Sequence, residues 1–380
     1  MFWCIGRVEL SQMLTRLYID NFRCFVNFEH KPAARELIFG ANGSGKSTFM
    51  DALLLLRQFV MRGDVFDDFF VLNQRTRWLD QPQQTFELEA VLDGCSYIYR
   101  LVIQPWGEPQ RPRVKSETVL LDGKPIFEFL TGEVHLYNDR FEHKVTYPFD
   151  WHRSALATIV PRRDNEKLSR FKRWVSGLYC FRINPFAMAS RADGENLYPN
   201  VDLSNIASWY RHLVQADPEQ NAAMLKGLRA SLDGFSFLRL EPAGENVRLL
   251  AAEFAHEGGK TSKFYFSELS DGQRCLISLH TILHFVLAKG STVILDEPDN
   301  FISLREIQPW LMAVTDAVEE GEGQVLLISH HPEAINQWAP RSGVQFVREG
   351  AGPVRVMEFH GDPDGSLPPS ELVARGWERE

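Results

Sequence analysis

One glycine-rich run constrains the fold of this chain more than any other feature. Residues 40–47 read Gly-Ala-Asn-Gly-Ser-Gly-Lys-Ser, which has the form GxxxxGK[ST]. Residues 36–39 before it, Glu-Leu-Ile-Phe, are typical of a strand, and residues 47–60 after it carry apolar side chains at helical spacing. Glycines let the backbone curl so that its N–H groups converge, and the start of a helix adds unpaired N–H groups and a favourable dipole. The run therefore predicts a strand–loop–helix unit that binds phosphate groups.

The residue types in this loop predict how a nucleotide would be held. Lys46 would reach the β- and γ-phosphates, and the hydroxyl of Ser47 would ligate Mg²⁺. The other candidate contacts in the loop are Gly40, Asn42, Gly43, Ser44, Gly45 and Thr48. The alternative is a turn rich in glycine and serine that only joins a strand to a helix.

Three later motifs add acidic and polar groups in a fixed order. Residues 269–273 read Leu-Ser-Asp-Gly-Gln and open an apolar helical stretch that runs to about residue 288. Residues 293–297 form an apolar strand that ends in Asp296 and Glu297, and residues 326–330 form another that ends in His330. Asp296 would hold Mg²⁺, directly or through water. Glu297 would take a proton from an attacking water or orient that water.

Together these motifs resemble the ABC-type ATPase superfamily, whose signature has the form LSGGQ. The resemblance implies that ATP is bound between two copies of the chain, with Ser270, Gly272 and Gln273 of one copy at the γ-phosphate held by the other. It also implies that His330 is the switch histidine, a hydrogen-bond partner for the γ-phosphate and water. We interpret His331 as a polar residue at the end of the strand. Asp271 departs from the commoner glycine. The alternative for the signature is an ordinary helix N-cap, since serine and aspartate both cap well.

The start of the chain indicates the branch of the superfamily. Residues 14–25 look like the first strand of SMC, RecF and OLD-type ATPases, which implies that Arg23 contacts ATP; the alternative is an exposed strand charge. Residues 297–300 and 329–333 resemble the DEPEN and THSPE segments of OLD-like ATPases. Residues 302–304 depart from the Leu-His-Pro common in those relatives. The resemblance runs from about residue 13 to about residue 347.

The resulting fold class is α/β: a P-loop NTPase of the ABC-ATPase head type, with a mixed central sheet, an antiparallel β lobe and a helical lobe. In residues 84–103, apolar side chains recur at every second position on both sides of Asp93-Gly94, which predicts a hairpin. The sequence contains no sustained heptad repeat, so it does not predict a long coiled-coil arm. We expect one discontinuous head over 13–376. Its expected parts are a phosphate-loop and β lobe at about 13–150, an inserted helical lobe at about 151–290, an acidic-strand and histidine part at about 291–350, and a tail at about 351–380. Further expected strands lie at 117–121, 125–129 and 135–136, and further helices at 205–215 and 218–232.

Composition limits the cellular setting and the partners. The five cysteines (Cys4, Cys24, Cys95, Cys180 and Cys275) show no CxxC spacing, which favours reduced thiols in the cytoplasm. No apolar run approaches the roughly 20 residues that cross a bilayer. The net charge of −9 argues against a protein that coats nucleic acid. Two basic segments, 111–115 and 162–173, are solvated surface or a docking surface for DNA or a partner. His280 and His284 have a zinc-like spacing but lack an evident third ligand.

The expected activity is ATP hydrolysis to ADP and phosphate by a homodimer or higher homo-oligomer that uses Mg²⁺. About 50 residues follow His330, too few for the nuclease domain that OLD-type relatives carry. The resemblance therefore implies an anti-phage system in which a separately encoded nuclease or toxin is the effector. The first alternative is a RecF-like DNA-repair clamp on double-stranded DNA. The second is the energy subunit of a transporter, which the segments at 21–25 and 296–300 disfavour.

Overall fold

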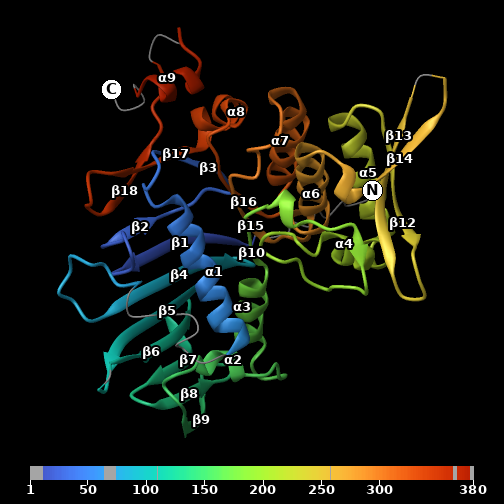
Figure 1. Ribbon diagram of the computed structural model, residues 1–380. Helices are drawn as coiled ribbons and strands as arrows, with labels where there is room; N and C mark the ends of the chain where they lie inside the picture. The colour runs from blue at the N-terminus through green and yellow to red at the C-terminus, as the bar shows by residue number, and fades with distance from the viewer. Residues whose placement is uncertain (1–11, 64–73, 109, 257, 363–365, 377–380) are drawn as a thin grey trace, which may run out of the picture. The chain divides into compact units, whose positions relative to one another are not determined.

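The computed structural model describes residues 12–63, 74–108, 110–256, 258–362 and 366–376 (Figure 1). The chain divides into two compact units, each assembled from segments that are distant in sequence. Unit 1 comprises Met1–Ala34, Gly40–Tyr179 and Gln345–Met357. Unit 2 comprises Arg35–Phe39, Cys180–Val344 and Glu358–Glu380. That all of this forms one functional head stays a prediction.

An antiparallel sheet of eight strands forms most of unit 1. Its order is β2-β1-β4-β5-β6-β7-β8-β9. The strands are β1 (Met13–Asp20), β2 (Phe28–His30), β4 (Gln84–Leu92), β5 (Cys95–Trp106), β6 (Arg111–Leu121), β7 (Lys124–Leu130), β8 (Glu133–Tyr137) and β9 (His143–Pro148). In β4 every second residue is buried, which is the pattern of a sheet with one face on the core. The antiparallel lobe expected from the sequence is therefore present.

Two-residue turns set the register of three hairpins, β4–β5, β6–β7 and β7–β8. Asp93 and Gly94 both have positive φ, at 50° and 78°, and Leu92 pairs with Cys95. This is the type I′ geometry, whose twist matches that of paired strands and which favours Asp-Gly. The pairs Asp122-Gly123 and Thr131-Gly132 repeat the pattern. The predicted 84–103 hairpin is confirmed, and the strands expected near 117–121, 125–129 and 135–136 lie within β6, β7 and β8.

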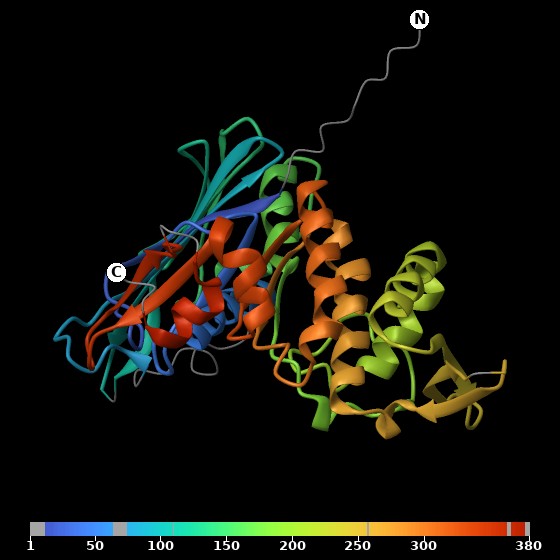
Figure 2. The ribbon, with the colours of Figure 1, turned by 90° about the horizontal axis from the view of Figure 1, so that it is seen from above.

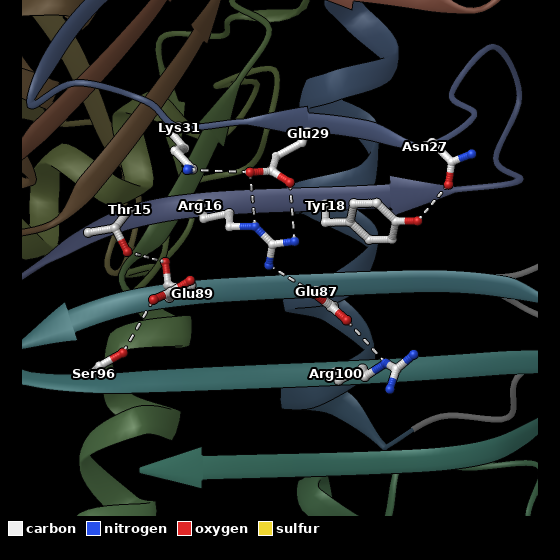
Figure 3. Close-up of polar contacts among 10 residues, drawn as sticks. All are labelled: Thr15, Arg16, Tyr18, Asn27, Glu29, Lys31, Glu87, Glu89, Ser96 and Arg100. Atoms are coloured by element: carbon white, nitrogen blue, oxygen red, sulfur yellow. Dashed lines mark hydrogen bonds and ion pairs between the residues drawn. The ribbon is translucent and has the colours of Figure 1, made fainter. Parts of the chain in front are cut away.

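The two faces of this sheet differ in chemistry. Figure 3 shows the polar face across β2, β1, β4 and β5, where Glu87 pairs with Arg16 at 2.9 Å and with Arg100 at 3.1 Å. On the buried face, Phe171 stacks against Tyr97 and Tyr99, with ring centroids 6.0 and 5.9 Å away. Unit 1 also contains three helices: α1 (Lys46–Arg62), α2 (Ala155–Thr158) and α3 (Glu166–Ser176).

Unit 2 contains a parallel core. The strands β15 (Thr292–Asp296), β16 (Gln324–Ile328) and β3 (Arg35–Phe39) pair in parallel. Every residue of β15 and β16 is buried, as expected for strands covered on both faces. The full order of the sheet is β10-β15-β16-β3-β17-β18. Its other strands are β10 (Leu178–Phe181), β17 (Gly343–Arg348) and β18 (Val354–Glu358), and most residues of β17 and β18 belong to unit 1.

Helices and a small antiparallel sheet complete unit 2. The helices α4 (Ile206–Ala216), α5 (Pro218–Ser231), α6 (Asp271–Phe285) and α7 (Leu304–Glu319) pack together, with α6 and α7 side by side in Figures 1 and 2. The two helices expected at 205–232 are thus α4 and α5. The remaining elements are α8 (Pro332–Ser342), α9 (Pro369–Arg375), β11 (Arg191–Ala192), β12 (Phe235–Pro242), β13 (Arg248–Ala255), β14 (Thr261–Tyr265) and the 3₁₀ turns η3 (Pro185–Ala187), η4 (Phe266–Glu268) and η5 (Leu287–Lys289).

The described helices are short. The longest of them, α1, has 17 residues. In the described part of the chain, no helix combines the length and the apolar character that a membrane crossing requires.

Candidate functional site

The glycine-rich loop in unit 1 has the backbone shape that its sequence predicts. Gly40, Gly43 and Gly45 have φ values of 145°, 79° and 101°, which side-chain-bearing residues rarely adopt. A Cβ atom on Gly40 would also lie 2.3 Å from the carbonyl oxygen of Phe346. Conformation therefore requires glycine at all three positions, and close packing adds to that requirement at Gly40.

The loop ends at an open helix N-terminus. Helix α1 begins at Lys46, its N-cap Gly45 offers no side-chain cap, and no acidic residue lies in the first turn. The first N–H groups of a helix have no partner within the helix, so they suit an anion. The hydroxyl of Ser44 is buried without a hydrogen-bond partner. This orphaned donor and the uncapped helix fit a phosphate group, and Asn42 and Ser47 are exposed beside them.

Lys46 folds back over its own loop. Its buried Nζ donates hydrogen bonds to the carbonyl oxygens of Gly40 at 2.7 Å and Ala41 at 3.2 Å. The ammonium is thus held at the mouth of the loop, from which its flexible chain could turn toward a bound phosphate.

Arg23 lies against α1 and is not on a strand. Its Nη1 is 2.5 Å from Oδ2 of Asp51, one helical turn beyond Ser47, and its backbone N–H donates to the carbonyl oxygen of Gln74. β1 ends at Asp20, so the exposed strand charge considered from the sequence does not describe this residue. Its contact with ATP stays a prediction.

In unit 2, the acidic strand end gathers three predicted groups and one unexpected arginine. Asp296, the last residue of β15, is buried, and its Oδ2 accepts hydrogen bonds from Nε and Nη2 of Arg182 at 3.0 and 2.9 Å. Glu297 has a left-handed φ of 48°, and its Oε1 lies 3.8 Å from Nε2 of His330. Non-glycine residues held at positive φ are strained and cluster at functional sites.

The sequence reasoning did not find Arg182. Its only sequence signal is a polar residue directly after the apolar strand β10, much as the apolar residues of β15 end in Asp296. Charge complementarity between residues so far apart in sequence becomes visible only when the sheet brings the two strand ends together.

The two neighbouring histidines have different surroundings. His331 caps α8, because its Nδ1 accepts a hydrogen bond from the backbone N–H of Glu333 at 3.2 Å. Its own N–H donates to Ser329 Oγ, which in turn donates to Asp299 at 2.5 Å. Burial raises the pKa of Asp299. His331 thus acts as a helix cap, while His330 faces Glu297.

The LSDGQ segment forms a complete helix cap. Ser270 Oγ accepts from the N–H of Gln273, and Gln273 Oε1 accepts from the N–H of Ser270, which is the capping-box arrangement. Gly272 is required by packing, because a Cβ there would lie 2.6 Å from the carbonyl oxygen of Phe301. Asp271 pairs with Arg274 at 2.5 Å, which gives the unusual aspartate a structural role. Ser270 therefore caps α6 and is also exposed at the surface, and its role at the γ-phosphate of a partner copy stays a prediction.

Two exposed aromatic side chains lie beside this cap. Phe186 is 71% exposed and Phe301 is 42% exposed, and their rings meet edge to face with centroids 5.6 Å apart. Adjacent exposed phenylalanines are unusual on a surface that stays in water, and such patches mark interaction surfaces.

In the helical part of unit 2, His280 is buried and His284 is half-buried. Nε2 of His280 is 2.8 Å from the hydroxyl of Ser231. Burial lowers the pKa of His280 to about 3 and that of His284 to about 4. Among the described residues, no group of three or more histidine, cysteine or acidic side chains is arranged to hold a metal ion.

The sequence matches the family described as "AAA domain, putative AbiEii toxin, Type IV TA system" over residues 37–336, which is most of the 380-residue chain. The chain belongs to this family. No curated protein matches the sequence.

Two solved structures have a similar fold. An SMC head bound to the C-winged helix domain of ScpA is 13% identical with a TM-score of 0.55, covering 91% of this chain and 98% of that chain. The Smc head domain with a coiled coil and joint from Pyrococcus yayanosii is 11% identical with a TM-score of 0.51, covering 97% of this chain and all of that chain. The chain therefore has the α/β fold of an SMC-type ATPase head, as the motifs predicted. The OLD-like branch stays a prediction.

Proposed function

We propose that this AAA-family chain binds and hydrolyses ATP as a homodimer, with each nucleotide held between the glycine-rich loop of one copy and the LSDGQ segment of the other. The observation that carries nucleotide binding is the loop in unit 1. Three glycines at positive φ, the orphaned hydroxyl of Ser44 and the uncapped start of α1 together form a phosphate cradle. The residues assigned to the nucleotide are Arg23, Gly40, Asn42, Gly43, Ser44, Gly45, Lys46, Ser47 and Thr48.

Mg²⁺ is the cofactor that these oxygen donors suit. The exposed hydroxyl of Ser47 and the carboxylate of Asp296 are hard ligands of the kind that Mg²⁺ prefers. When bound, the ion would neutralise phosphate charge. Because Asp296 already accepts two hydrogen bonds from Arg182, that arginine keeps the buried carboxylate paired before the ion arrives.

Glu297 and His330 are the proposed catalytic residues. The left-handed backbone at Glu297 turns its side chain away from the strand path, and the carboxylate accepts a hydrogen bond from Asn300 at 3.0 Å. A carboxylate held in this way can orient a water and accept its proton. His330, 3.8 Å from Glu297, would add a hydrogen bond to the same water or to the γ-phosphate.

The homodimer is supported by the surface around the signature. Ser270 is exposed, and the exposed Phe186–Phe301 pair lies next to Gly272. In a two-fold dimer the same patch is used twice, so each site takes Lys46 from one chain and Ser270 from the other. Burial of the phenylalanines on closure would add a hydrophobic contribution.

The activity is tested with two substitutions and their controls. Lys46→Ala should abolish ATP binding, measured by isothermal titration calorimetry. Glu297→Gln should bind ATP but hydrolyse it at least 100-fold more slowly, since general bases contribute about 10²–10⁴-fold. Lys226→Ala and Glu320→Gln, which change exposed residues of α5 and of the end of α7, should behave as wild type. Near-normal turnover by the Glu297→Gln protein would reassign the role of the base.

The proposed partner is a separately encoded nuclease or toxin in an anti-phage system. The support is the description of the family, which names a toxin and a type IV toxin–antitoxin system. Co-expression with the product of the adjacent gene should give a complex whose toxicity depends on Lys46. The alternative is a RecF-like clamp. It predicts instead ATP-dependent binding of double-stranded DNA that weakens steeply with salt.

A further inference from the structure

Two exposed tryptophans lie together where β5 and β6 pair in unit 1. Trp106 is the last residue of β5 and is 57% exposed, while Trp151 is 38% exposed. Their rings are nearly parallel, with an interplanar angle of 24° and centroids 6.4 Å apart. Neither ring is buried in the hydrophobic core. We call Trp106, Trp151, Arg111 and Arg113 the tryptophan face.

Arg113 holds this pair of rings in place. Its guanidinium carbon lies 3.6 Å from the centroid of the Trp106 ring and 4.6 Å from that of Trp151, at cation–π distances. With the Gln104 amide oriented by its hydrogen bonds, its oxygen accepts from Nε and Nη2 of Arg113 at 3.1 and 2.7 Å. The backbone N–H of Val114 donates to the carbonyl oxygen of Trp151 at 2.8 Å. The indoles are therefore preorganised, so the protein would lose little side-chain entropy when a flat ligand stacks on them.

Positive charge surrounds the rings. Arg111 is directly opposite Trp106 in the β5–β6 register, and it is exposed. A hollow of about 570 Å³ next to the hairpin is lined by the arginines 75 and 77, by one acid, Asp80, and by Pro105 and Gln110. Two further acids lie nearby: Glu108 at the hairpin tip, and Asp150, which precedes Trp151 and is 2.9 Å from Nδ1 of His152. Arginines therefore outnumber carboxylates around the rings, although the whole chain carries a net charge of −9.

Three basic residues of the other basic segment make contacts within unit 1, while Arg162, Arg163 and Arg173 are exposed. On α3, Lys172 donates to three backbone carbonyls of residues 156–159, and Arg170 pairs with Asp93 at 3.0 Å. Lys167 donates to the backbone of Asp139. These three side chains of α3 thus make contacts within unit 1. The segment on β6 combines positive charge with exposed aromatic rings.

We propose that the tryptophan face binds single-stranded nucleic acid, with a base stacked on Trp106 and adjacent phosphates paired with Arg111 and the arginines of the hollow. Unpaired bases offer flat π-faces to aromatic side chains, whereas the bases of a duplex are stacked on one another. Arginine suits phosphate because its planar fork donates two parallel hydrogen bonds. This surface is independent of the glycine-rich loop, so the proposal stands or falls separately from ATP hydrolysis.

The test is fluorescence anisotropy with a fluorescein-labelled 20-nucleotide dT strand, the matching rU strand and a 20-base-pair duplex, each in 50 to 200 mM salt. We expect both single strands to bind and the duplex to bind more weakly. Trp106→Ala should weaken single-strand binding roughly 5- to 150-fold, the range of one lost stacking contact. Trp106→Phe should restore most of it. Arg111→Gln should reduce the slope of log affinity against log salt by about 0.7.

Matched controls separate this face from general effects of charge and hydrophobicity. Tyr198→Ala removes an aromatic side chain of unit 2 that is similarly exposed, and Lys226→Gln removes an exposed charge of α5; neither should change the affinity. Absence of single-strand binding at 50 mM salt would overturn the proposal. So would equal binding by Trp106→Ala and wild type, or tighter binding of the duplex than of the single strands.

Discussion

A fully buried carboxylate in unit 1 offers a sharp test of how that unit is held together. Glu117 on β6 accepts hydrogen bonds from Ser154 Oγ at 2.6 Å, Tyr99 Oη at 3.0 Å and the backbone N–H groups of Ala155 and Leu156 at 3.0 and 3.3 Å. It thereby connects the eight-stranded sheet to the start of α2. All four donors point at one side chain.

Replacing Glu117 with alanine leaves these donors without an acceptor. Each buried unsatisfied group costs about 1–3 kcal/mol. The two hydroxyls can rotate to other acceptors, but the two backbone N–H groups cannot, so we expect a loss of about 3–5 kcal/mol in the free energy of unfolding. At roughly 2–4 °C per kcal/mol for a unit of this size, the midpoint should fall by about 10 °C. Urea denaturation followed by circular dichroism and thermal melts would measure both quantities.

Glu117→Gln is the matched variant, and pH adds a second signature. Its amide oxygen can still accept from the two N–H groups, so its cost should be about 1 kcal/mol near pH 5. Burial raises the pKa of Glu117, although its hydrogen bonds act in the opposite direction. A raised folded-state pKa contributes stability below the unfolded value of about 4.3, and this contribution is lost as pH rises through the folded value.

The deficit of the glutamine variant relative to wild type should therefore shrink as the pH rises above the unfolded-state pKa of about 4.3. An alanine variant within 1 kcal/mol of wild type would refute the reasoning. A glutamine deficit that grows with pH would show that the folded-state pKa is lowered, not raised.

Two further substitutions test the candidate site. Arg182→Ala removes the partner of the buried Asp296 carboxylate. In the ATP-bound Glu297→Gln background, we therefore expect Mn²⁺ to bind a few-fold more tightly, as measured by electron paramagnetic resonance. Unchanged or weaker Mn²⁺ binding would contradict the pairing of Arg182 with Asp296. Gly272→Ala places a Cβ 2.6 Å from the Phe301 carbonyl oxygen and should destabilise the fold by about 1–3 kcal/mol, measured by urea unfolding; a more stable protein would contradict this account.

The elements that were predictable from the sequence depend on local chemistry. The Asp93-Gly94 turn was predictable because both positions require positive φ, and the strands β15 and β16 because strands buried on both faces need continuous apolar runs. The cap at Ser270 was likewise visible, because a capping box spans only four residues.

The features that were missed depend on long-range contacts. Arg182 and Asp296 are 114 residues apart in sequence, and Trp106 meets Trp151 only because β5, β6 and the segment after β9 come together. Such pairings carry no periodic signal. The division into two discontinuous units also depends on long-range contacts, since β3 belongs to one unit and the loop that follows it to the other.

The measurement that tests the shared nucleotide site most directly is ATPase activity in a mixture of two inactive variants. Lys46→Ala should be inactive because it lacks the phosphate ligand, and Ser270→Arg because it blocks the partner's site while its own loop still binds ATP. In a mixed dimer, one site combines intact Lys46 with intact Ser270, and the other lacks both. Random mixing in equal amounts should therefore restore about a quarter of wild-type activity. If the mixture stays inactive although the variants form mixed dimers, or if Ser270→Arg alone hydrolyses ATP normally as a monomer, the sites are not shared and LSDGQ is only a helix cap.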